Sequence, residues 1–343
     1  MNPDAKRFGR GTKFISVMDI LNNQFICYDN IRASVEVMDG DIDTYGVNYG
    51  DILFQRSSET LEDVGQANVY LDSKPAIFGG FVIRGKSKGN YNPLFFRYLL
   101  ASPTARKRII VKGAGAQHFN IGQDGLSKVS LDIPCMQEQK KIGELLQCID
   151  ARIATQNKII EKLQSLIKGL AVALTTKEKA NIAISQCLEC HSSTLQESEV
   201  LSSGLCKVFG ANGLVGYKDV PQMNGDAILV IKDGSGVGTV SYAQGKFSVI
   251  GTLNYLTVIG NNDLRYLYFA LSVFNFQPYK TGMAIPHIYF KDYGKAKIYC
   301  PSLAEQKRVA NVLDKLESKL FVEQELLASF NQQKLYLLGK MFI

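Results

Sequence analysis

An internal repeat constrains this chain more than any other feature of its sequence. Residues 134–141 read PCMQEQKK and residues 301–308 read PSLAEQKR, an offset of 167 positions. In each copy a proline stands just ahead of an acidic residue, and strong helix formers follow, which is typical of a helix N-terminus. The sequence therefore predicts two equivalent units, each ending in a helix.

Each copy opens a long stripe of apolar residues at a strict 4-3-4-3 spacing. The first stripe runs from Ile142 to Leu174 with nine of ten positions apolar, and the second runs from Val309 to Met341 with eight of ten. A single stripe would indicate a helix packed on its own domain. Two stripes of equal length and phase favour pairing with each other, as an antiparallel coiled coil, because the intervening domain must return the chain to its start.

Segments ahead of the two helices also correspond. Residues 50–53 (GDIL) and 225–229 (GDAIL) each read as a turn that enters an apolar strand, and residues 93–100 and 263–271 each read as a short amphipathic helix. The repeat also predicts strands at residues 126–134 and, 167 positions later, at residues 293–301.

Short alternating strands such as residues 237–242 and 255–259 indicate that the two domains are mixed α/β, of the α+β kind. The predicted division of the chain is a first domain at residues 1–133, a long helix at 134–180, a second domain at 181–300 and a C-terminal long helix at 301–343.

Composition excludes some classes of protein. A hydrophobic content of 46% in 343 residues excludes a mainly disordered chain and suits two folded domains. No apolar run reaches the length of a membrane span, and no secretory signal is recognisable, so we expect a cytoplasmic protein with reduced cysteines. The net charge of +7 is spread along the chain, and charge alone does not establish a polyanionic partner.

Two further motifs connect the repeat with a known family. Residues 209–217 (FGANGLVGY) are close to a motif of target-recognition domains, and residues 14–20 (FISVMDI) are similar to the equivalent segment of another subtype. With the twice-repeated Glu-Gln-Lys helix start, they make nearly the whole chain resemble the specificity subunits of type I restriction-modification enzymes. Only about a dozen residues precede Phe14, whereas about thirty separate the first long helix from Phe209, so the first domain is expected to lack an initial strand.

The resemblance implies a non-catalytic subunit that binds double-stranded DNA. Each domain would read one half of a split sequence, while the helices would set the spacing and hold two modification (methyltransferase) subunits, with restriction/translocase subunits in the full assembly. S-adenosylmethionine, ATP and magnesium would belong to those partners, so no catalytic, cofactor or metal residues are expected in this chain.

Rival motifs are weak. Residues 187–191 (CLECH) spell a haem-attachment pattern, and Cys187, Cys190, His191 and Cys206 could ligate zinc, but the second half of a zinc motif is missing. Residues 232–238 (KDGSGVG) are rich in glycine like a phosphate loop, but strand chemistry follows them, which favours a hairpin. Neither a Walker sequence nor an amino-methyltransferase motif occurs.

Candidate DNA contacts cluster beside two glycine-bearing loops, where the backbone can approach phosphate closely. His118 and His287 are matched to each other, after residues 113–117 and 282–286, and each histidine has the alternative of purely local hydrogen bonds. The full set of candidate DNA-binding residues is Arg106, Lys107, Arg108, Lys112, Gln117, His118, Asn212, Tyr217, Lys280, His287, Tyr289, Lys291 and Lys295.

Two other functions stay open at this point. A two-headed structural or adaptor protein could use the helix pair as a spacer between protein-binding domains. A small-molecule enzyme has only the glycine and cysteine motifs to support it.

Overall fold

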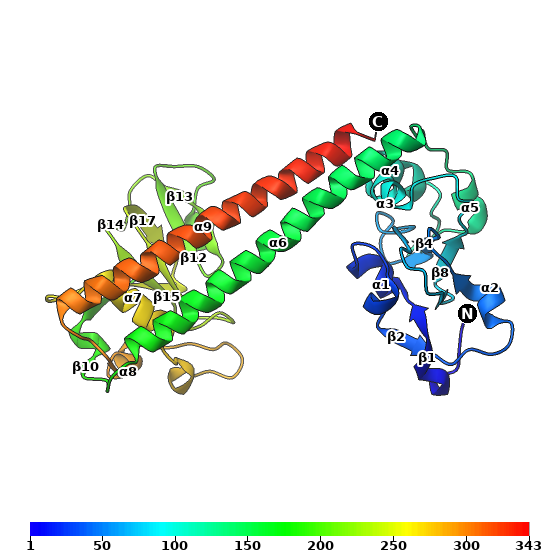
Figure 1. Cartoon of the computed structure of the whole chain (residues 1–343). Helices are drawn as coiled ribbons and strands as arrows, with labels where there is room; N and C mark the ends of the chain where they lie inside the picture. The colour runs from blue at the N-terminus through cyan, green and yellow to red at the C-terminus, as the bar shows by residue number, and fades with distance from the viewer. Residues whose placement is uncertain (343) are drawn as a thin grey trace. The chain divides into compact units, whose positions relative to one another are not determined.

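A computed structural model describes residues 1–342 (Figure 1). The chain forms two compact units, one made of residues 1–157 with those from 326 onward and the other of residues 158–325. Both long helices are shared between the units, so neither helix forms a unit of its own. Each unit is described by itself below.

The first unit contains two small sheets. In the first sheet, β1 and β7 are parallel at its centre and antiparallel strands flank them, in the order β2 (Ala33–Val35), β1 (Phe8–Ile15), β7 (Ala76–Phe78) and β3 (Gly46–Val47). The second sheet is antiparallel, in the order β6 (Ala67–Val69), β4 (Ile52–Gln55) and β8 (Val82–Gly85). A two-stranded ladder joins β5 (Ser57–Ser58) to β9 (Phe119–Asn120).

The second unit repeats this plan. Its first sheet has the order β13 (Gly213–Lys218), β12 (Cys206–Gly210), β17 (Lys246–Val249) and β14 (Met223–Asn224), again with a parallel central pair. The second sheet is antiparallel, in the order β11 (Leu188–Ser192), β18 (Leu253–Val258), β15 (Ala227–Ile231) and β16 (Val240–Ala243). A short ladder joins β10 (Ile182–Ala183) to β19 (Lys297–Ile298).

The two units differ at one sheet edge. β6, β4 and β8 correspond in order and direction to β16, β15 and β18, but in residues 1–342 β11 has no counterpart in the first unit. The first unit therefore has a three-stranded sheet where the second has four strands.

Short helices cover the sheets and connect to the long helices. In the first unit they are α1 (Val17–Asn22), α2 (Asp41–Tyr45), α3 (Pro93–Ala101), α4 (Pro103–Ile110) and α5 (Gln123–Ser127); in the second they are α7 (Leu264–Ser272) and α8 (Phe290–Tyr293). Short 3₁₀ turns occur at η1 (Ala5–Arg7), η2 (Tyr28–Asn30), η3 (Ile184–Gln186), η4 (Glu197–Glu199) and η5 (Gln277–Tyr279). The prediction of equivalent short helices is confirmed by α3 and α7, which both begin after an Asn or Asp cap.

The long helices are α6 (Met136–Thr175) and α9 (Leu303–Lys340). All twenty positions of the two predicted stripes are buried or half-buried, including the polar Gln156 and Glu323. In the first unit, Leu146 and Ile149 of α6 share an apolar cluster with Leu337 and Phe342 at the end of the chain. In the second unit, Ala171 near the end of α6 shares a cluster with Val309 and Leu313 near the start of α9. The start of α6 thus lies beside the end of α9, and the end of α6 beside the start of α9, so the predicted antiparallel pairing is confirmed (Figure 1).

The predicted strands ahead of the long helices are mostly wrong. In the second unit only Lys297–Ile298 forms a strand, and it does so by pairing with β10. In the first unit, residues 126–134 contain the end of α5 and then irregular chain. A strand needs a neighbour to accept its backbone hydrogen bonds, and among the described residues the first unit has no segment equivalent to β10.

Candidate nucleic-acid interface

Each unit carries a five-residue loop that is closed by the same pair of backbone hydrogen bonds. In the first unit the N–H groups of Ala114 and Asn120 donate to each other's carbonyls at 2.9 and 2.8 Å. In the second unit Thr281 and His287 do the same, at the same two distances. Both pairs differ by 167 positions, so the backbone aligns the loops without reference to their side chains. We call residues 115–119 the first loop and residues 282–286 the second loop.

Both loops open on a glycine with a positive φ, +147° at Gly115 and +87° at Gly282. A Cβ at Gly115 would collide with the carbonyl oxygen of His118, and one at Gly282 would collide with that of Ile285. Only glycine can therefore turn the chain this tightly at the base of each loop.

This alignment corrects the predicted correspondence of the two histidines. With an offset of 167, His287 matches Asn120 and lies at the base of its loop, whereas His118 matches Ile285 and lies within the loop. The prediction matched the two histidines by residue type, which placed them two positions out of register.

The turn between β15 and β16 supports the second loop. The N–H of Gly234 donates to the carbonyl of Pro286 at 2.9 Å, and the N–H of Ile288 donates to the carbonyl of Lys232 at 2.9 Å. Residues 232–238 are therefore a glycine-rich hairpin turn, as predicted, and they hold a neighbouring loop in place.

The second loop presents apolar side chains between polar and cationic ones. Met283 is fully exposed and Ile285 is 68% exposed. Beside the loop, the Tyr289 ring lies 5.0 Å from the His287 ring and 5.0 Å from the Lys291 ammonium group. Lys280 precedes the loop and is half-buried, and Lys295 follows α8 and is exposed. The structure thus gathers His287, Tyr289 and Lys291 at one loop, with Lys280 next to it in the chain.

The first loop presents polar side chains. Gln117 and His118 are exposed, and β9, at the end of the loop, is paired with β5. His118 borders an open cavity of about 590 Å³, whose other lining residues include Glu59 and Asp63. These carboxylates would repel phosphate, so His118 is better suited to the edge of a base than to the DNA backbone.

The basic residues of α4 do not all face solvent. The Arg106 guanidinium donates to the carbonyls of Glu62 and Val64 at 2.7 and 2.8 Å, and burial lowers its pKa. Arg106 therefore holds the segment at residues 62–64 against α4. Arg108 donates to the carbonyl of Ser130 at 2.7 Å and pairs with Asp132 at 3.3 Å.

Lys107 and Lys112 have exposed side chains. Of the four basic candidates in this segment, these two are the better placed to meet phosphate.

Asn212 and Tyr217 lie on a different hairpin. Asn212 is exposed in the turn between β12 and β13, where Gly213 takes a φ of +97°. Tyr217 is half-buried on β13, and its backbone exchanges two hydrogen bonds with Leu201. This hairpin belongs to the β13–β12–β17–β14 sheet, whereas the second loop is held by the turn between β15 and β16 of the other sheet, so the predicted candidates fall into separate groups.

Sequence reasoning missed a buried glutamine at the start of each long helix. Gln139 and Gln306 are 3% and 2% exposed and are again 167 positions apart. Each amide donates to the carbonyl of the proline five residues earlier, Pro134 or Pro301, at 2.9 and 2.8 Å. Each side-chain oxygen accepts the backbone N–H of the residue that caps the preceding short helix, at 2.9 and 2.8 Å. The glutamine of the repeated Glu-Gln-Lys motif therefore fastens each long helix to its domain.

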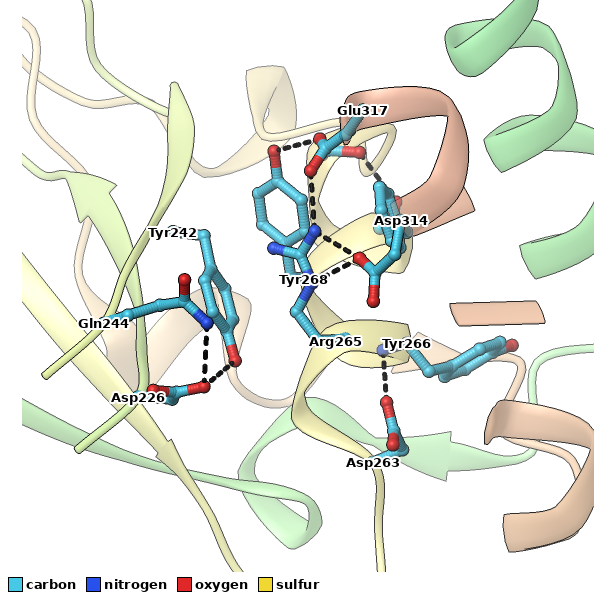
Figure 2. Close-up of polar contacts among 11 residues, drawn as sticks. Asp226, Tyr242, Gln244, Asp263, Arg265, Tyr266, Tyr268, Asp314 and Glu317 are labelled. Atoms are coloured by element: carbon cyan, nitrogen blue, oxygen red, sulfur yellow. Dashed lines mark hydrogen bonds and ion pairs between the residues drawn. The ribbon is translucent and has the colours of Figure 1, made fainter. Parts of the chain in front are cut away.

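An acidic residue that lies eleven positions after this glutamine connects the long helix to its domain a second time in each unit. In the second unit, Arg265 of α7 donates to Asp314 and to Glu317 of α9, each at 2.6 Å (Figure 2). Tyr268 also donates to Glu317, at 2.8 Å, and the Arg265 guanidinium lies 4.3 Å from the Tyr242 ring. Burial opposes the charged form of Arg265, but its bonds to the two carboxylates outweigh this effect and raise its pKa.

In the first unit, the equivalent of Glu317 is Asp150, which is 8% exposed. Its carboxylate accepts hydrogen bonds from Tyr98 at 2.8 Å and Gln24 at 2.9 Å, and the Lys334 ammonium group lies 2.6 Å away. Lys334 is one of the two polar positions in the second predicted stripe, and this ion pair explains its presence there.

These shared features agree with comparison to known proteins. The family model described as the type I restriction modification DNA specificity domain matches residues 1–165 and 191–332. The chain belongs to this family.

Individual specificity subunits are similar over parts of the chain. The MjaX specificity subunit of Methanocaldococcus jannaschii, itself described as putative, is 30% identical over 146 residues, covering 41% of this chain and 34% of the relative. The EcoprrI specificity subunit of Escherichia coli is 24% identical over 110 residues, covering 32% and 27%. The chain thus spans about a third or less of the length of the curated relatives it matches.

Solved structures share the fold of this specificity-family member. A type I restriction-modification S subunit from M. genitalium has a TM-score of 0.63 at 18% identity, over 98% of this chain and 94% of that one. A chain from a structural study of complex assembly and conformational transition in the type I system has a TM-score of 0.56 at 13% identity, over 91% and 86%. The mixed α/β architecture with long helices is therefore that of S subunits.

Within residues 1–342, the cysteine and histidine residues of the rival motifs do not all come together at one place. No group of three or more His, Cys, Asp or Glu side chains gathers there as a metal site would require. Cys206 lies on β12 and His191 on β11, in different sheets, and His191 instead contacts the Thr257 hydroxyl at 2.9 Å. In the same part of the chain, no helix is both long and apolar enough to cross a membrane.

Proposed function

We propose that this protein is the DNA-recognition subunit of a type I restriction-modification system and reads a bipartite site in double-stranded DNA. The observation that carries the proposal is the pair of loops with identical backbone closure, one in each unit of a chain that belongs to the specificity family. Two equivalent but chemically different loops suit two different half-sites.

In this proposal, phosphate contacts supply most of the affinity and its dependence on salt. The exposed lysines of the predicted set, Lys107 and Lys112 in the first unit and Lys291 and Lys295 in the second, would make these contacts. The loops would then meet base edges in the major groove, where each base pair presents a distinct pattern of donors, acceptors and methyl groups.

The chain itself would not be catalytic. Two methyltransferase subunits and, in the full assembly, restriction/translocase subunits would carry out the chemistry with S-adenosylmethionine, ATP and magnesium, in the cytoplasm. Such partners are supported by membership of the specificity family and by the likeness to a chain whose structure was solved in a study of type I complex assembly. The same two findings favour recognition over the alternative of a two-headed adaptor protein.

Selection from a random DNA library with the purified full chain tests the proposal. A specificity subunit should enrich one split sequence with a fixed gap, and its affinity should fall steeply as salt rises. A pull-down with that DNA should retain a methyltransferase from the source cells. Enrichment of no sequence would exclude the recognition function, and DNA-independent capture of other proteins would favour the adaptor.

A further inference from the structure

The two loops differ in chemistry although their backbones are equivalent. The shared offset of 167 matches Ala116 with Met283 and His118 with Ile285. The first loop therefore offers hydrogen-bonding groups, from Gln117 and His118, where the second offers a thioether and a branched aliphatic chain. Met283 and Ile285 are among the exposed large hydrophobic residues of the chain, and the Met283 side chain is fully exposed to solvent.

The second loop is held firmly enough to place these side chains. Its base is closed by the Thr281 and His287 backbone pair, and its end is fixed by the bond from Gly234 to Pro286. Pro286 also restricts its own backbone. The backbone of the second loop is thus held in place, and the side chains of Met283 and Ile285 at its tip are exposed.

Its surroundings indicate what it can meet. Lys291, Tyr289 and His287 adjoin the loop, with Lys280 just before it, and all of these side chains suit a polyanion better than an apolar protein surface. On duplex DNA, the base faces are stacked and covered. The apolar group that the major groove exposes is the C5-methyl of thymine, which aliphatic side chains contact.

We propose that Met283 and Ile285 read thymine methyl groups in the half-site bound by the second unit, while the first loop reads its half-site by hydrogen bonds. This proposal rests on the proposed DNA-recognition function and adds the chemical basis of its specificity. It requires A·T pairs at the positions that the second loop covers. It also assigns Gln117 to a base with a neighbouring donor and acceptor, as adenine has.

Replacing thymine by deoxyuridine tests this directly, because uracil keeps the base pair and lacks only the methyl group. The full chain is first used to select its site, and the thymines of each half-site are then replaced separately. Burial of one methyl group corresponds to about a fourfold change in Kd. We expect deoxyuridine to weaken binding about fourfold for each contacted thymine in one half-site.

The variant Met283→Ala, Ile285→Ala shows whether that loss comes from the second loop. Both side chains are exposed, so the variant should fold, which thermal unfolding can verify. Its Kd should be the same for thymine and deoxyuridine in that half-site. The matched control, Gln117→Ala, His118→Ala in the first loop, should keep the full deoxyuridine penalty there.

Three results would overturn the inference: a selected site without A·T pairs in one half, an unchanged Kd on deoxyuridine, or a penalty that persists in the second-loop variant. Insertion of the side chains between bases, as a wedge, would give the second of these results. Failure of the proposed function is distinct, because then the library would yield no preferred sequence with which to begin.

Discussion

The ion pair between Asp150 and Lys334 should stabilise the first unit by a measurable coupling energy. Asp150 is 8% exposed, and the Lys334 side chain is 28% exposed. Removing one partner of a fully buried pair costs about 3–5 kcal/mol, because the other charge is left without compensation. Since Lys334 is partly in solvent and Asp150 keeps its bonds to Tyr98 and Gln24, we expect Lys334→Met to cost about 2–3 kcal/mol.

Neutralising Asp150, alone and together with Lys334, tests whether the two charges stabilise each other. Asp150→Asn alone should cost about 2 kcal/mol, because it leaves Lys334 without its carboxylate and weakens two hydrogen bonds. In the double variant neither charge is stranded, so the expected loss is about 2 kcal/mol rather than the roughly 4–5 kcal/mol of the sum. The expected coupling energy is therefore about 2–3 kcal/mol.

Urea unfolding followed by far-UV circular dichroism and by tyrosine fluorescence can measure these energies, because the chain has 16 Tyr and no Trp. Lys340→Met, at an exposed lysine in the last turn of the same helix, is the matched control and should change stability by less than about 0.5 kcal/mol. Additivity of the two single variants to within about 0.5 kcal/mol would show that the pair contributes no coupling, and the argument would be wrong.

Three further predictions concern the helix attachments, the DNA surface and the spacing of the half-sites. Gln139→Ala and Gln306→Ala should each lower the free energy of unfolding by about 1–3 kcal/mol by leaving buried backbone groups unpaired, whereas Gln137→Ala, at an exposed position, should be neutral in the same urea titration. The double variant Lys107→Ala, Lys112→Ala should reduce the slope of log K against log salt concentration for DNA binding by about 2. Arg106→Ala should mainly reduce thermal stability. An unchanged slope would place both lysines away from DNA. Inserting one heptad after Asn157 and one after Leu326 preserves the phase of the apolar stripes and adds about 10 Å of helix. Methylation sequencing or library selection should then find the same half-sites with a gap about three base pairs longer. Changed half-sites with the old gap would show that the helices do not set the spacing.

The long helices were predictable because their pattern is local. The 4-3-4-3 stripes depend only on residues within one helix, and two stripes of equal phase identify each other as partners. The strand expected at residues 126–134 failed for the opposite reason. Its apolar and polar residues alternate suitably, but a strand depends on a distant neighbour, and among the described residues the first unit has none at this position.

Site residues were harder to predict because orientation is not encoded locally. Nothing in the sequence indicates that Arg106 turns inward to the carbonyls of Glu62 and Val64. Matching His118 to His287 by type was misleading, whereas the constant offset of 167 already assigned His287 to Asn120. The same offset already matched Gln139 with Gln306, but it matched their Glu and Lys neighbours equally well, so only the structure distinguishes the buried glutamine.

The backbone closure of the two loops affects how the recognition specificity of this protein can evolve. Each loop is closed by main-chain hydrogen bonds and opens on a glycine, so the three residues that follow the glycine make no demand on the core. Substitutions there can alter the surface that we propose meets DNA with little effect on folding, while the glycine and the closing pair preserve the shape. New recognition could therefore arise in one unit at a time, by single substitutions, without loss of a stable protein along the way.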